Sequence, residues 1–193
     1  LSTESYISQI MSFIDGLELV KPVVMGCSIG GRIILHLAIH FPEKFKALIG
    51  LQSAGHIDPY YDISWLHRQD VHGGEVCGGI AYGLMAPTSP DNDKFETMWH
   101  YMQGGPGIFK GDLFFYKFDG NIGNEIKKID NSKCPIYLLT GEYDYSATPE
   151  ETKSLADTIG IQMIKMKNVG HFPMSENPEE FLKYLHPILE KIN

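Results

Sequence analysis

The chain has 193 residues, of which 43% are hydrophobic and 21% charged, as in an ordinary soluble globular protein of one domain, with or without an insertion. Its formal net charge of -8 argues against partners such as nucleic acid or an anionic membrane surface, and no apolar run approaches the roughly 20 residues of a membrane span. The 3 cysteines are scattered without a CxxC pair, so they indicate neither a disulfide framework nor a zinc site and fit a cytoplasmic location.

Both ends of the chain carry a regular pattern of strands and helices. Short apolar runs are typical of buried strands, and they lie at 22–26, 46–51, 135–141 and 162–166. Apolar residues at helical spacing predict helices over 3–16, 29–40, 149–159 and 178–192. Alternating strands and helices favour an α/β fold, with a mostly parallel sheet that helices cover on both faces.

The stretch 54–130 interrupts this pattern. It is rich in glycine, proline and aromatic residues, with weak strand signals and short helices expected near 74–86, 91–103 and 107–117. We therefore expect a core made of 1–53 and 131–193, with a helical cap inserted at 54–130. The cap's aromatic and methionine side chains would line a mostly apolar acyl or aryl pocket, or form the cap's own core.

The segment Gly26-Cys27-Ser28-Ile29-Gly30 falls where a buried strand must become a helix. A sharp turn at this point exposes a serine hydroxyl, and it needs small residues two positions before and after the serine. We therefore interpret Ser28 as a nucleophile, with the backbone N–H of Ile29 as one oxyanion-hole donor. An ordinary glycine-rich turn is the alternative.

Two further polar residues follow later strands. Asp144, in Thr140-Gly141-Glu142-Tyr143-Asp144, could orient a histidine, with Glu142 as the competing acid or a turn role as the alternative. His171, in a loop between the last strand and the last helix, is placed to act as a general base, with an ordinary surface-loop histidine as the alternative. The other histidines lie in predicted helices or in the cap and are interpreted as structural, although a cap histidine could touch substrate. Arg32 and Lys110 could meet a substrate carboxylate, but both are expected on the surface.

Together, Gly26-Cys27-Ser28-Ile29-Gly30-Gly31, the order Ser28, Asp144, His171, and Gly170-His171-Phe172-Pro173 resemble the α/β-hydrolase family. The resemblance is greatest to members that include carboxylesterases, enol-lactone hydrolases and carbon–carbon hydrolases. It implies a serine hydrolase that needs no cofactor or metal and cleaves small apolar esters or related acyl compounds. Ser28 would attack the carbonyl, His171 would take the proton of Ser28, and Asp144 would hold the imidazole.

The same resemblance leaves alternatives. A carbon–carbon hydrolase or an enol-lactonase would use the same three residues, and a non-catalytic binding module could keep the fold. Family members have more strands before the nucleophile than this sequence provides ahead of Ser28. We therefore expect the N-terminal part of the sheet to be missing, with the strand at 22–26 left unpaired at one edge. A second chain or a missing segment would complete the sheet and supply the second oxyanion donor.

Overall fold

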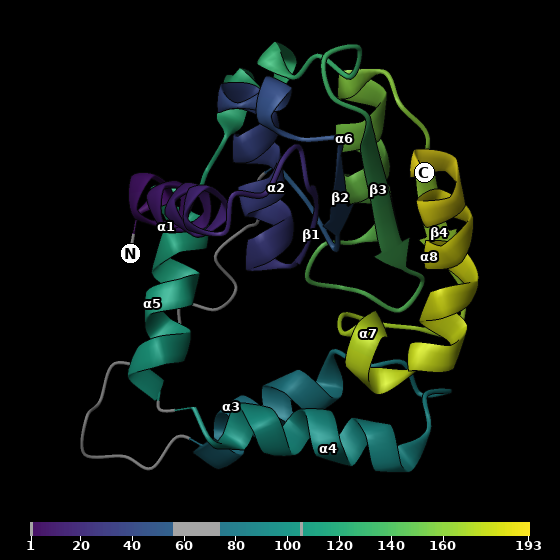
Figure 1. Cartoon of the computed structure of the whole chain (residues 1–193). Coiled ribbons are helices and arrows are strands. Elements are labelled where there is room, and N and C mark those ends of the chain that lie inside the picture. Colours follow the sequence, from purple (N-terminus) through teal and green to yellow (C-terminus); the bar gives the residue numbers. More distant parts are fainter. Residues whose placement is uncertain (1, 56–73, 105) are drawn as a thin grey trace.

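The structure is a computed structural model that describes residues 2–55, 74–104 and 106–193. Strands and helices alternate near both ends of the chain, and helices alone occupy the described part between β2 and β3 (Figure 1). In chain order the elements are α1 (Thr3–Gly16), β1 (Val23–Cys27), α2 (Ile29–His40), η1 (Pro42–Lys44), β2 (Ala47–Leu51), α3 (Gly74–Gly83), α4 (Asp91–Met102), α5 (Pro106–Lys117), η3 (Gly123–Lys128), β3 (Ile136–Gly141), α6 (Pro149–Ile159), β4 (Met163–Met166), α7 (Pro173–Glu176) and α8 (Pro178–Ile192).

The described strands form one parallel sheet in the order β1-β2-β3-β4. Because all strands run the same way, their carboxyl ends meet at one edge, which faces α3, α4 and α7 in Figure 1. The α/β fold with a parallel sheet is therefore confirmed. Each strand starts or ends within one residue of the predicted run.

Helices cover both faces of the sheet. Alternate residues of β2 show the division: Leu48 packs with α1, α2 and α6, whereas Ile49 packs with α8 on the opposite face. The same holds in β3, where Leu138 and Leu139 belong to the two different clusters. Both clusters are buried, so the sheet forms the middle of a three-layer core.

Strand β1 is one edge of the described sheet, since it pairs only with β2. Val23 and Met25 are 36% and 43% exposed, whereas every residue of β2 is buried. The expected unpaired edge is therefore present among the described residues. Such an edge leaves backbone donors and acceptors of β1 without a strand partner.

Local capping explains why several helices begin where the sequence predicts. The Ser2 side chain accepts a hydrogen bond from the N–H of Ser5 at the start of α1. Thr148 and Glu151 form a capping box at the start of α6, whose first residue is Pro149. These contacts satisfy N–H groups that have no partner within the helix.

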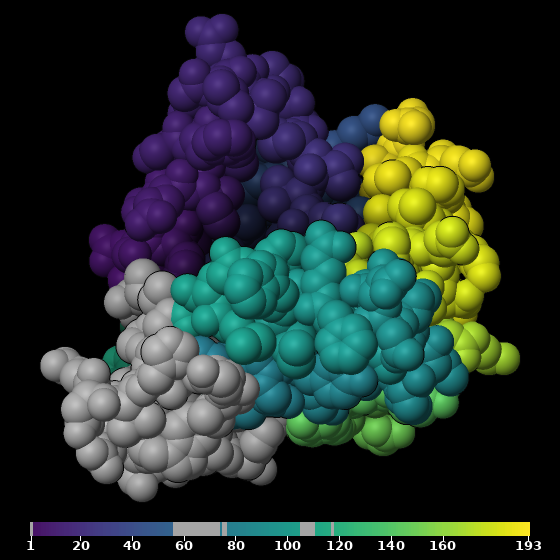
Figure 2. Space-filling view, turned by 90° about the horizontal axis from the view of Figure 1, so that it is seen from below, coloured from purple at the N-terminus to yellow at the C-terminus, as the bar shows by residue number. Residues whose placement is uncertain are grey.

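Helices α3, α4 and α5 match the short helices expected near 74–86, 91–103 and 107–117. In Figure 2, which looks from below Figure 1, the residues of α3 and α4 lie in front of much of the molecule. Part of the expected cap, 56–73, lies outside the described residues. No described helix is long and apolar enough to cross a membrane.

Candidate active site

Ser28 occupies the turn between β1 and α2 in a left-handed backbone conformation, with φ of 58°. Few residues other than glycine adopt this conformation, and such strain is typical of functional positions. A Cβ on Gly26 would lie 2.4 Å from the backbone carbon of Gly30, so the turn requires glycine at 26. By contrast, a Cβ on Gly30 meets no described atom within 4 Å. The expectation that both glycines are needed is therefore wrong for Gly30, because the turn closes on the side of Gly26.

Asp144 and His171 lie in the loops that follow β3 and β4, and both side chains are buried. His171 Nδ1 lies 2.9 Å and 3.0 Å from the two carboxylate oxygens of Asp144. Asp144 Oδ1 also accepts hydrogen bonds from the N–H groups of Ser146 and Ala147, which fix the carboxylate. Of the two acids named from the sequence, Asp144 is the one bonded to the histidine.

His171 Nε2 lies 2.8 Å from Ser28 Oγ. The structure therefore brings together three predicted residues that are far apart in the chain. With Nδ1–H donated to Asp144, Nε2 can accept the proton of the Ser28 hydroxyl. This arrangement can convert a weak hydroxyl into a nucleophile, because a buried carboxylate stabilises the protonated imidazole.

Ile29 is the first residue of α2. A first-turn N–H has no partner within its own helix, so the N–H of Ile29 can donate to a bound group. Ile29 also lines a cavity of about 60 Å³ beside Ser28. The cavity's other lining residues are mostly apolar or aromatic, and come from α3 and the turn after it, α4, α5 and the loops after β3 and β4: Ile80, Ala81, Leu84, Tyr101, Asp112, Leu113, Tyr116, Ser146, His171 and Phe172.

Two buried polar residues position the histidine loop, and the sequence interpretation gives neither a role. Gln52, directly after β2, donates to the carbonyl of Gly170 at 2.7 Å and accepts from the N–H of Gly141 at 3.0 Å. Glu176, in α7, accepts from the N–H groups of Gly170 and Phe172. A polar residue just past a buried strand was the available signal for Gln52, as it was for Asp144.

Arg32 corrects an expectation, since it is 1% exposed rather than on the surface. It lies one helical turn after Ser28 on the inner face of α2, where its Nη1 donates to the carbonyl of Gly120 at 2.9 Å. Burial lowers the pKa of Arg32 to about 10. The side chain of Lys110, also expected on the surface, lies outside the described residues.

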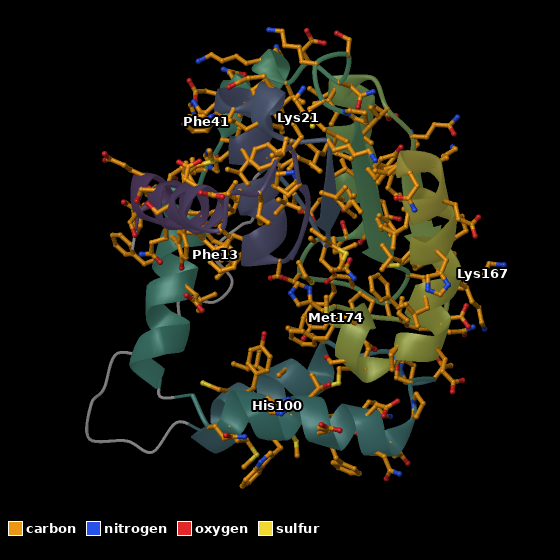
Figure 3. The ribbon with its side chains drawn as sticks, viewed as in Figure 1. Phe13, Lys21, Phe41, His100, Lys167 and Met174 are labelled. Atoms are coloured by element: carbon orange, nitrogen blue, oxygen red, sulfur yellow. The ribbon has the colours of Figure 1, made fainter. Side chains whose placement is uncertain are left out.

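The described histidines other than His171 lie on helices, as expected. His36 and His40 stack on α2, His100 is on α4 (Figure 3), and His186 is on α8. His56, His67 and His72 lie outside the described residues. Within the described ranges, no group of three or more His, Cys, Asp or Glu side chains could hold a metal ion.

The thiol next to Ser28 is a poor competitor as a nucleophile. Cys27 Sγ donates to the carbonyl oxygen of His171 at 3.4 Å, and burial raises the pKa of this thiol far above its ordinary value. Burial also raises the pKa of Cys77, and that of Cys134 to about 11. Since the thiolate is the reactive form, all three cysteines are expected to be inert near neutral pH.

Comparisons with known proteins agree with this arrangement of elements. No protein-family model matches the chain, and a search of curated proteins finds no significant match. A thermophilic esterase from Thermogutta terrifontis matches all of this chain and 73% of its own, with a TM-score of 0.85 and 18% identity. The enol-lactonase from Burkholderia xenovorans LB400 matches 98% of this chain and 74% of its own, with a TM-score of 0.81 and 16% identity.

A third solved structure carries the name of the fold. MGS-M2, an α/β hydrolase enzyme from a Medee basin deep-sea metagenome library, matches 95% of this chain and 70% of its own. Its TM-score is 0.67 at 16% identity. These likenesses show that the chain has the α/β-hydrolase fold, as the resemblance predicted.

Proposed function

We propose that the chain carries the active site of a serine hydrolase that cleaves carboxylic esters or related acyl bonds. The observation that carries this proposal is the line of hydrogen-bond contacts from Ser28 Oγ through His171 to Asp144, at 2.8 Å and 2.9 Å. Fold alone does not decide function, so the proposal depends on the chemistry of these three side chains. The esterase and enol-lactonase among the structural neighbours support the same reaction class.

In this proposal Ser28 Oγ attacks the substrate carbonyl while His171 Nε2 takes its proton. Asp144 holds the imidazole in the correct tautomer and stabilises its positive charge. The N–H of Ile29 donates to the carbonyl oxygen as that oxygen becomes negative. His171 then protonates the leaving alcohol, and a water molecule, activated by the same histidine, releases the acyl group from Ser28.

We further propose that 54–130 forms a cap over the site. Helices α3, α4 and α5 supply Ile80, Tyr101 and Leu113 to the wall of the cavity beside Ser28. The cavity measures about 60 Å³, well below the roughly 300–1,000 Å³ of pockets that hold drug-sized ligands. Short acyl groups are therefore the substrates that this site favours.

The test is hydrolysis of p-nitrophenyl acetate, butyrate and octanoate, together with a simple aryl lactone. We expect acetate and butyrate to be cleaved fastest, and Ser28→Ala to lose at least about 1,000-fold in kcat. Preferred cleavage of the lactone would favour the enol-lactonase alternative, which the neighbour from Burkholderia xenovorans LB400 supports. A folded protein that cleaves none of them would favour a non-catalytic binding module.

A further inference from the structure

A second side chain besides His171 contacts the hydroxyl of Ser28. The phenol oxygen of Tyr116, in α5, lies 2.7 Å from Ser28 Oγ. Tyr116 is 8% exposed and lies 88 positions further along the chain than Ser28. Ser28 Oγ therefore contacts both His171 Nε2 and the phenol oxygen of Tyr116.

The hydrogen-bond roles in this pair follow from the partners of His171. When His171 Nδ1–H is donated to Asp144, Nε2 must accept the only proton of the Ser28 hydroxyl. The phenol of Tyr116 must then donate to Ser28 Oγ. Burial raises the pKa of Tyr116 well above its ordinary value, so the phenol keeps its proton near neutral pH.

Tyr116 is held in place from several directions. Its ring packs against Ile29, Ala54 and Ala147. The guanidinium of Arg32 lies 5.3 Å from the centre of the ring, and Arg32 Nη1 binds the carbonyl of Gly120 a few residues further on. With its ring fixed in this way, only the phenol O–H has to reorient, so little reorganisation is needed when charge develops in the transition state.

Arg32 also makes the surroundings of Tyr116 favourable to negative charge. Its Nε and Nη2 atoms are buried and have no hydrogen-bond partner among the described residues. Within these residues, the positive charge of Arg32 is therefore poorly compensated close to the phenol. In a site of low dielectric, this charge strengthens hydrogen bonds to an anion.

We propose that Tyr116 is a catalytic residue that donates a hydrogen bond to the oxyanion, as a side-chain partner to the N–H of Ile29. This inference depends on the function proposed above. When Ser28 Oγ bonds to the carbonyl carbon, the carbonyl π pair moves onto the oxygen, which becomes an alkoxide on the same carbon as Oγ. The Tyr116 donor, already at Oγ, turns to this neighbouring oxygen and keeps its proton, while His171 holds the proton of Ser28. The electron pair on the alkoxide oxygen re-forms the carbonyl double bond when the leaving group departs.

The test compares Tyr116→Phe with wild type. We expect kcat for p-nitrophenyl acetate to fall about 100-fold with KM nearly unchanged, because the donor acts only on the developing charge. Labelling of Ser28 by a fluorophosphonate is expected to slow by a similar factor, since its phosphoryl oxygen occupies the same place. The acid limb of the pH profile of kcat/KM should not move, because His171 keeps its partners.

The matched control is Tyr82→Phe, which removes a phenol oxygen from α3. Tyr82 is 36% exposed and stacks on Phe95 at 5.8 Å, away from the cavity beside Ser28. We expect this variant to keep wild-type kcat. A loss of kcat equal to that of Tyr116→Phe would overturn the proposal, because it would trace the effect to the fold of the helices.

An unchanged kcat in folded Tyr116→Phe, or a raised KM alone, would also overturn the proposal. If that variant does not fold, 3-fluorotyrosine at position 116 is used instead, because it keeps the ring contacts and makes the phenol a stronger donor. We then expect kcat to rise, and an unchanged kcat would contradict the proposal. Wild type that neither hydrolyses esters nor labels would refute the proposed function and this inference with it. If wild type is active but substitution of Tyr116 leaves kcat unchanged, this inference is refuted while the proposed function stands.

Discussion

Glu176 fixes the position of His171 without touching its ring. One carboxylate oxygen of Glu176 accepts hydrogen bonds from the backbone N–H groups on either side of His171, at 3.0 Å and 2.8 Å. The other oxygen accepts from the N–H of Ala86 and the hydroxyl of Ser89, both at 2.7 Å. A fully buried carboxylate thus ties the histidine loop to the segment that follows α3.

Glu176→Gln is expected to destabilise the protein and to lower kcat. The new amide places an NH₂ group against donors, so at least one buried N–H loses its acceptor, at a cost of about 2–4 kcal/mol in the free energy of unfolding. Urea unfolding and ester hydrolysis measure the two effects. Glu179→Gln, exposed in the first turn of α8, is the matched control and should change neither. A wild-type midpoint for Glu176→Gln would contradict this account of the loop.

Asp144→Asn is expected to lower kcat by about four orders of magnitude while the protein stays folded. The amide can still face His171 Nδ1, but it favours the wrong tautomer and no longer stabilises the charged imidazole. Steady-state hydrolysis of p-nitrophenyl acetate measures the loss. Glu142→Gln, two residues earlier in the chain, should remain within a few-fold of wild type. A larger loss of kcat in Glu142→Gln than in Asp144→Asn would show that Asp144 is not the acid that acts on His171.

Gly26→Ala and Gly30→Ala form a matched pair at the turn that carries Ser28. At Gly26 the added Cβ would meet the backbone of Gly30 at 2.4 Å, so the turn must shift. We expect kcat to fall and the free energy of unfolding to fall by about 2 kcal/mol or more. At Gly30 the added Cβ meets no described atom within 4 Å, so stability should be nearly unchanged. Thermal melts of both variants provide the measurement. Equal destabilisation of the two would contradict the described turn.

His36 is expected to make the fold sensitive to acid. Burial lowers the pKa of His36 below its ordinary value of 6.5. The unfolded chain therefore binds a proton at His36 more readily than the folded chain. The contribution of neutral His36 to the free energy of unfolding is complete above pH 6.5 and is lost as the pH falls through the folded-state pKa.

The check is the free energy of unfolding in urea at pH 7.5 and at pH 5. We expect the loss between these two pH values to be smaller in His36→Gln than in wild type. His186→Gln, an exposed position on α8, serves as the control and should lose as much as wild type. An identical acid loss in all three proteins would show that His36 is not the group responsible.

Much of the core could be predicted because its signals are local. Helix α6 begins at Pro149 after Thr148, and α2 begins directly after Ser28, so capping residues and the strand-to-helix turn fix these boundaries. The meeting of Ser28, Asp144 and His171 followed from one physical rule. Residues just past parallel strands gather at the same edge of the sheet, whatever their separation in the chain.

Other parts of the site depend on contacts that no local pattern encodes. Tyr116 is one of many aromatic residues between β2 and β3, and its spacing does not show that its phenol reaches Ser28. The burial of Arg32 depends on the carbonyl of Gly120, which packing brings to α2 from far along the chain. The open space beside Gly30 depends on which side of the turn is crowded, and only the packed structure shows that.

Whether Ser28 is the nucleophile can be decided by trapping with a fluorophosphonate and locating the adduct by peptide mass spectrometry. We expect one adduct, on Ser28, in wild type, none in Ser28→Ala, and strongly slowed labelling in His171→Gln. Cys27, in the same peptide region, should stay unmodified because burial raises its thiol pKa. An adduct on another residue, or no adduct on the folded protein, would show that Ser28 is not the nucleophile.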